Sequence, residues 1–254
     1  MDTSLLIIFL ILTLIAEILG TVGGFGSSVF FVPIAGFFVD FHSVLGITVM
    51  LHMISNVSKI ALFRKAINKK MLLKIGLPSL IFVLIGSFLT SKFDSSFLQL
   101  LLSMFLIIMS LFFLAMKRAE VRPTTGNAIL GGSISGLIAG LLGTGGAVRG
   151  LTMAAYNLEK EVFVATSAMI DFFTDAGRTV IYAGQGYIHQ HDLYLIPYLL
   201  VAAFLGTWIG KKLLKHVHQA QFRTIVLSFI LVIGVVSLIQ YLMSSSSYLT
   251  LHEF

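Results

Sequence analysis

The sequence predicts an all-α polytopic membrane protein made of two inverted repeats, each with a glycine-broken helical hairpin plus three transmembrane helices. Three observations lead to this prediction. The composition is 57% hydrophobic and only 11% charged, long apolar stretches follow one another along the chain, and the second half repeats the pattern of the first. No polar stretch is long enough for a soluble domain, so we expect residues 1-254 to form a single membrane transport domain.

Apolar stretches give the expected helices in order along the chain. The first half holds them at about 4–39, 43–62, 75–91 and 97–116. The second half holds them at about 127–156, 162–182, 193–210 and 224–243. Most reach the roughly 20 residues that a transmembrane helix needs. Repeat one is therefore expected at about 4-116 and repeat two at about 127-243.

The two halves correspond to one another over most of their length. An offset of 119 or 120 residues pairs Gly20 with Gly140, Gly23 with Gly143, Thr48 with Ser167, Lys59 with Arg178 and Pro78 with Pro197. Such internal symmetry indicates a duplication, as in many transporter folds. The first stretch has no basic region before it and no small-residue cleavage signal, so we expect a retained helix and not a signal peptide.

A glycine run interrupts the first stretch of each half, at 20–26 and at 140–150. Glycine costs a helix about 1 kcal/mol relative to alanine and frees the backbone to turn. Lipid offers no hydrogen bonds, so a helix broken at membrane depth must have its free amides satisfied by protein or water, as at transporter binding sites. The alternative is that these glycines let neighbouring helices pack closely. Because the two runs occupy matching places, we favour broken helices.

Positive charge in the loops predicts the orientation. Three loops are basic: they carry Arg64, Lys65, Lys69, Lys70 and Lys74, then Lys117, Arg118 and Arg122 against Glu120, then Lys211, Lys212, Lys215 and Arg223. The loops at 91–96 and 183–192 are nearly free of Lys and Arg. Cytoplasmic loops carry the excess of Lys and Arg. The basic loops share one side only if each glycine-broken stretch is a hairpin, which inverts the repeats and places both termini outside.

The composition also argues against other classes of protein. The formal charge of +6 comes from short loops between apolar stretches, so it indicates membrane orientation and no nucleic-acid partner. The chain has no cysteine, and it contains no His-Glu-x-x-His or Gly-x-Ser-x-Gly motif. We expect no enzyme, no cofactor and no metal. His189, His191 and Asp192 form a compact group that would suit a metal, but we interpret it as a solvated outward loop.

The hairpin tips are the expected substrate site. A helix start exposes unpaired amides and the positive end of the helix dipole, which together attract anions. Hydroxyls beside the tips can donate to oxyanion oxygens, or bond only their own backbone. The expected substrate-binding residues at the tips are Gly23, Gly24, Gly26, Ser27, Gly143, Thr144, Gly145 and Gly146.

Charged residues within apolar stretches are the second group of candidates. An arginine at a helix centre costs about 2.5 to 3.5 kcal/mol to insert, so Arg149 and Arg178 should face a partner or a wet cavity. We assign both to substrate binding, with pairing to Asp171 or Asp175 as the alternative for Arg178. Four other residues are assigned to gating or coupling: His52, Lys59, Asp171 and Asp175. The alternatives are a satisfied helix-facing histidine for His52, a cytoplasmic anchor for Lys59 and an arginine partner for the two aspartates. Glu17 is a further ionisable group within an apolar stretch.

A family resemblance accompanies these residues. The segment 143–150, followed by 156–161, Ala165-Thr-Ser-Ala168, Asp175 and Arg178, resembles the second repeat of the TauE/SafE family, also called the sulfite exporter or TSUP family. Gly23-Gly-Phe-Gly26 with Phe31-Val-Pro33 and Gly46-Ile-Thr48 resembles its first repeat. The resemblance implies a small integral membrane transporter that exports sulfite or related sulfur compounds and sulfonates.

The expected function is export of a small anion, a sulfur oxyanion or organosulfonate, through the cytoplasmic membrane by alternating access. The expected partners are that anionic sulfur-containing substrate and the lipid bilayer. Two alternatives stay open: an anion channel of similar architecture, and proton-coupled organosulfur uptake. A cell interior that is negative favours exit of an anion by about 2.3 kcal/mol per charge per 100 mV, so export requires no coupling ion.

Overall fold

A computed structural model describes residues 3–24, 26–63, 67–115, 121–216 and 219–251, and every regular element in these ranges is helical. The first half contains α1 (Thr3–Gly23), α2 (Ser28–Ala35), α3 (Phe41–Leu62), α4 (Lys69–Met71), the π-helix η1 (Leu72–Gly76), α5 (Leu77–Thr90) and α6 (Ser95–Ala115). The second half contains α7 (Thr125–Leu142), α8 (Gly146–Ala154), α9 (Lys160–Gly184), the 3-10 helix η2 (Gln190–Leu195), α10 (Ile196–Leu214) and α11 (Gln219–Leu251). The all-α prediction is confirmed.

Seven helical segments of the described chain are long and apolar enough to cross a membrane. Many of their large apolar side chains are exposed, whereas many polar side chains are buried, which is the distribution expected when lipid is the solvent. The helix expected at 162–182 forms as part of α9, whose 25 residues span about 37 Å. It is absent from the seven because it carries Asp171, Asp175 and Arg178, which partner other residues inside the protein.

Both glycine runs break a helix, as predicted. In the first, Gly24 and Gly26 adopt φ of 71° and 86° between α1 and α2. In the second, Gly143 ends α7 with φ of 74° before α8 begins. These left-handed values suit glycine because it has no Cβ. Gly20 lies against the returning chain, where an added Cβ would be 2.4 Å from the amide nitrogen of Ser27.

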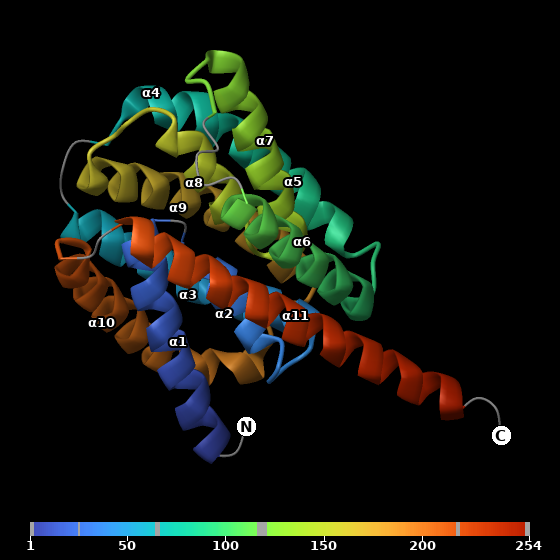
Figure 1. The fold of residues 1–254 in the computed structure, drawn as a ribbon. Coiled ribbons are helices and arrows are strands. Elements are labelled where there is room, and N and C mark those ends of the chain that lie inside the picture. The colour runs from blue at the N-terminus through green and yellow to red at the C-terminus, as the bar shows by residue number, and fades with distance from the viewer. Residues whose placement is uncertain (1–2, 25, 64–66, 116–120, 217–218, 252–254) are drawn as a thin grey trace.

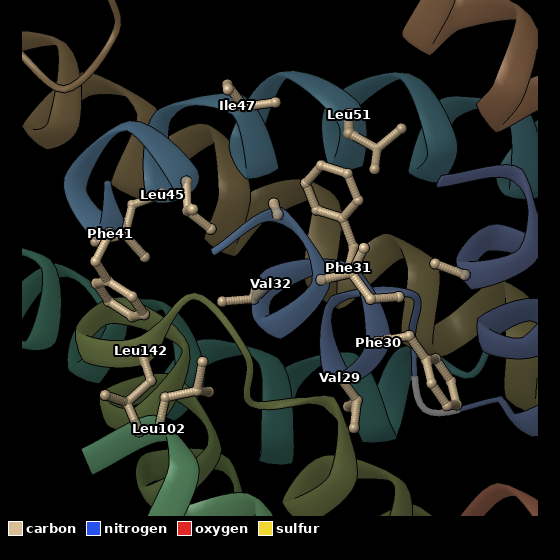
Figure 2. Packing of buried hydrophobic residues seen from close by; sticks show 14 of the residues in the cluster. Val29, Phe30, Phe31, Val32, Phe41, Leu45, Ile47, Leu51, Leu102 and Leu142 are labelled. Carbon is tan, nitrogen blue, oxygen red and sulfur yellow. The ribbon is translucent and has the colours of Figure 1, made fainter. Parts of the chain in front are cut away.

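The short returning arm of the first hairpin, α2, lies in the core of the protein. Its eight residues are all buried, and at about 12 Å it is too short to cross a bilayer. Figure 2 shows Val29, Phe30, Phe31 and Val32 of this helix among side chains from α3, α6 and α7. The returning arm of the first hairpin is therefore enclosed by protein.

The two halves pack through corresponding helices. Helix α1 lies against α10, and α7 lies against α5, while α3 meets α9 and α6 meets α11 between the halves (Figure 1). Three glycines of α7, at 132, 136 and 140, touch the backbone of η1 and α5 so closely that an added Cβ would lie at most 2.4 Å from a carbonyl oxygen. For these glycines the close-packing alternative is the correct one.

The described loops gather at two opposite ends of the helices. At one end, Lys211 donates to the carbonyl of Leu62 and Lys74 to Thr125, the latter at 2.7 Å. At the other, Ser95 contacts His42 at 2.9 Å. We call these the basic end and the opposite end. The basic loops therefore share one end where they are described; outside the described part lie Arg64, Lys65, Lys117, Arg118, Glu120 and the side chain of Arg223.

Candidate functional site

Glu17 of α1 is the centre of a buried polar cluster that joins the first hairpin to α3. Its side chain is fully buried. Ser27 at the hairpin tip donates to one carboxylate oxygen, and Ser55 donates to the other at 2.5 Å. Lys59 lies 3.4 Å from the same oxygen as Ser55 and donates to the hydroxyl of Ser55 at 2.6 Å. A buried charge persists only when it is paired and hydrogen-bonded, and Glu17 meets both conditions.

His52 links this cluster to the second half of the protein. Its Nε2 lies 3.3 Å from Ser27 Oγ, and its Nδ1 lies 3.3 Å from Arg178 Nη2. Nδ1 also lies 3.6 Å from Asp175 Oδ2, so this nitrogen faces both the guanidinium and its carboxylate partner. Asp175 completes the junction: it accepts from Arg178 Nε at 2.8 Å and from Asn56 Nδ2 at 2.8 Å. Polar groups thus run without a break from Lys59 to Arg178.

Arg178 contacts the second hairpin at the C-terminal end of α7. Its Nη1 donates to the carbonyl of Ala139 at 3.0 Å, and Tyr182 donates to the carbonyl of Gly140 at 2.6 Å. The last four carbonyls of a helix have no partner within it, and a cation is favourable at that end of the dipole. These contacts favour the structural alternative for Arg178, in which it pairs with Asp175 and ends α7.

Arg149 occupies a different position, between the two hairpin tips. It lies in the first turn of α8 and is 2% exposed. Two of its nitrogens lie 2.5 Å from the oxygens of Asp171, and Nε donates to Ser167 at 3.1 Å. A Cβ added to Gly26 of the first hairpin would sit 3.8 Å from Asp171 and 3.9 Å from Arg149. The ion pair therefore lies beside the other tip without a side chain between them.

A small cavity, which we call the tip cavity, opens next to this pair. It is lined by Gly20, Gly24, Gly26, Lys59, Val164, Ser167, Ala168 and Asp171. Its volume is about 10 Å³, the lower limit for one water molecule. It brings together the glycines of the first tip, the cation Lys59, a hydroxyl and a carboxylate that is 19% exposed. A tetrahedral or pyramidal oxyanion would need this cavity to widen.

A larger cavity of about 350 Å³ adjoins the tip cavity, and we call it the vestibule. The two share Gly24 and Val164 as lining residues. The vestibule extends to Lys160 at the start of α9 and Leu214 at the end of α10, so it reaches toward the basic end. Phe163 stands at the boundary, with its ring 2.9 Å from the position of an added Cβ on Gly24.

The remaining predicted tip residues lie away from the tip cavity. An added Cβ on Gly145 would meet the carbonyl oxygen of Ser135 at 2.1 Å, so this glycine packs on α7. Gly143 faces Leu45 and Val32. Thr144 and Gly146 are buried and line neither cavity, and within the described residues the Thr144 hydroxyl has no hydrogen-bond partner. Gly23 lines the vestibule.

Sequence reasoning missed the small polar residues that complete the network. Ser55 and Asn56 were not singled out, although both contact the predicted charges. With His52 and Lys59 they stand at spacings of three, four and seven along α3. That spacing is one face of a helix, and a polar face on an apolar helix must be buried against protein. The pattern was therefore readable in the sequence.

The buried charged network, the two broken hairpins and the apolar exterior define a multi-pass membrane transporter. The chain belongs to the family described as sulfite exporter TauE/SafE, whose model matches residues 8–237. It is also similar to a probable membrane transporter protein of Methanocaldococcus jannaschii, with 27% identity over 92% of this chain and 96% of that protein. No solved structure matches the chain.

Proposed function

We propose that the protein exports a small sulfur-containing anion, sulfite or an organosulfonate, across the cytoplasmic membrane by alternating access. The observation that carries this proposal is the position of Arg149, paired with Asp171 beside both hairpin tips. An arginine offers several donors in a plane, a geometry that suits sulfonate and sulfite oxygens as it suits carboxylates. The anion would enter the tip cavity, which is lined by Lys59 and by Asp171, the partner of Arg149.

Two further features support a substrate path from the basic end. The vestibule reaches from that end to the tip cavity, with only Gly24, Val164 and Phe163 at the boundary. Corresponding helices of the two halves make corresponding contacts, α1 with α10 and α5 with α7. Both features support inverted repeats at about 4-116 and 127-243, whose relative motion would open the cavity to each side in turn.

The charge balance of the site determines how the anion is admitted. Three buried or partly buried cations each face a carboxylate: Lys59 with Glu17, Arg149 with Asp171, and Arg178 with Asp175. An anion that binds Arg149 must therefore replace Asp171 as its partner. If Asp171 stays ionised, the membrane potential drives export; if Asp171 takes up a proton, transport is proton-coupled.

Flux in liposomes distinguishes these mechanisms. With purified protein and sulfite, we expect saturable flux that is accelerated by sulfite on the opposite side, as in a carrier and unlike a channel. We expect the flux to follow an imposed potassium diffusion potential and to survive collapse of the pH gradient. Flux that follows only the pH gradient would establish proton coupling in its place. Absence of sulfite, taurine and sulfoacetate flux alike would contradict the proposed substrate class.

The orientation is testable because the chain has no cysteine. Lys92 lies in the exposed loop between α5 and α6, and Lys70 lies in exposed α4 at the basic end. We expect an impermeant maleimide to label Lys92→Cys in intact cells and to label Lys70→Cys only after the membrane is opened. If position 70 alone were labelled in intact cells, the basic end would face outward, which would contradict the proposed orientation.

A further inference from the structure

Three metal-ligating side chains meet in the connection between α9 and α10, at the opposite end. His189, His191 and Asp192 each offer one ligand atom, and these atoms all lie within 4.8 Å of one another. The two imidazole rings are stacked, with centroids 5.1 Å apart. The sequence suggested a solvated loop here. The structure differs because Asp192, in the first turn of η2, is only 5% exposed.

The distances within this group match those between ligands of a tetrahedral ion. His189 Nδ1 lies 3.4 Å from Asp192 Oδ2, and His191 Nε2 lies 3.3 Å from Asp192 Oδ1. Ligands at about 2.0–2.1 Å from a tetrahedral zinc ion are separated by about 3.3–3.4 Å. Each histidine has this separation from a different oxygen of Asp192, and one ligand atom from each of the three residues lies within 4.8 Å of the others, so a single ion would draw the three side chains somewhat closer together.

The buried carboxylate supplies the second observation. Asp192 Oδ2 is inaccessible to solvent and accepts no hydrogen bond. A buried carboxylate oxygen without a hydrogen bond lowers the stability of the folded protein, and a bound cation would compensate for this loss. Access is open from the other side, because the side chains of His189 and His191 are 39% and 76% exposed. An ion could therefore arrive from the aqueous phase and meet a carboxylate whose Oδ2 accepts no hydrogen bond from the described residues.

We propose that His189, His191 and Asp192 form a binding site for a divalent transition-metal ion of the Zn²⁺ type, with water as the fourth ligand. Two imidazoles with one carboxylate suit zinc, whereas Mg²⁺ and Ca²⁺ prefer oxygen ligands. Ser43 of α3 lies close to the group, with its Oγ 3.4 Å from His189 Nδ1. A bound ion would hold this connection against the start of α3, the helix that carries His52 and Lys59.

Titration of the purified full-length protein with ZnCl₂ tests the proposal, provided that the affinity tag contains no histidine. Calorimetry should find one Zn²⁺ per chain, and millimolar MgCl₂ should not displace it. His191→Ala and Asp192→Asn should each raise the Kd at least about 10-fold, since loss of even an outer-shell partner costs roughly 10- to 100-fold. His216→Ala is the matched control, because His216 is exposed on the basic end.

Size-exclusion profiles of all variants show whether each one is folded, and His191→Ala is the safer of the two because its side chain is mostly exposed. A wild-type protein that binds no Zn²⁺ would overturn the proposal. So would binding that is unchanged in both His191→Ala and Asp192→Asn, or binding that is lost equally in His216→Ala.

Discussion

Glu17→Ala is expected to lower the free energy of unfolding by about 3–5 kcal/mol, the usual cost of leaving one member of a buried ion pair alone. Lys59, which is 5% exposed, would then lose the carboxylate with which it forms an ion pair in the described structure. Ser27 and Ser55 would also lose the acceptor of their hydrogen bonds. The variant should unfold at a clearly lower denaturant concentration or temperature in detergent.

A second substitution separates the charge from the packing. Glu17→Met combined with Lys59→Met removes both charges and keeps apolar volume, so it should recover a large part of the stability that Glu17→Met alone loses. Lys92→Met, at an exposed position, is the control and should change stability by less than about 0.5 kcal/mol. If the double variant loses the sum of the two single losses, Glu17 and Lys59 are not energetically coupled.

Arg149→Gln is expected to reduce anion flux by about 10- to 100-fold, because a hydrogen bond to a charged group contributes about 1.5–3 kcal/mol and this site would lose its planar donor. Arg149→Lys keeps the charge but cannot reach two carboxylate oxygens and Ser167 together, so we expect an intermediate flux. Arg122→Gln, at an exposed position, is the control and should transport normally.

Combining Arg149→Gln with a change at Asp171 distinguishes a substrate-binding role of Arg149 from a purely structural one. If Arg149 serves only to neutralise Asp171, then Arg149→Gln with Asp171→Asn leaves no unpaired charge and should restore flux. If Arg149 binds the anion, the double variant should be folded, as judged by size exclusion and thermal unfolding, but inactive. Restored flux would therefore remove Arg149 from the proposed substrate site, and the site would have to be sought around Lys59.

Much of the fold could be predicted from the sequence. Hydropathy placed the spanning helices, and the paired glycine runs located both breaks, since the left-handed φ values at Gly24, Gly26 and Gly143 suit glycine. The roles of aligned glycines could not be predicted. Gly20 and Gly140 correspond in sequence, yet Gly20 touches the returning arm of its own hairpin and Gly140 touches α5. Sequence alone does not say which backbone approaches a glycine.

The charged residues of the candidate site could be predicted from the sequence, but the contacts between them could not. His52, Lys59, Asp171 and Asp175 do gather near the hairpin tips, because a charge in an apolar helix needs an inward partner. Which acid pairs with which base depends on how the halves dock. The Glu17–Lys59 pair joins residues from two helices of one half, and no local spacing indicates it.

The contact between α1 and α10 also bears on how the protein is made. Helix α1 is synthesised well before α10, the helix that covers it. At ribosomal rates of about 5–20 residues per second, roughly ten to thirty-five seconds pass before α10 follows α1 into the membrane. Until then, the buried Glu17 depends on its partners within the first half, Lys59, Ser27 and Ser55. The side of α1 that will face α10 is meanwhile in contact with lipid or with an insertion chaperone. The cover of α1 is therefore completed only after the second half has entered the membrane.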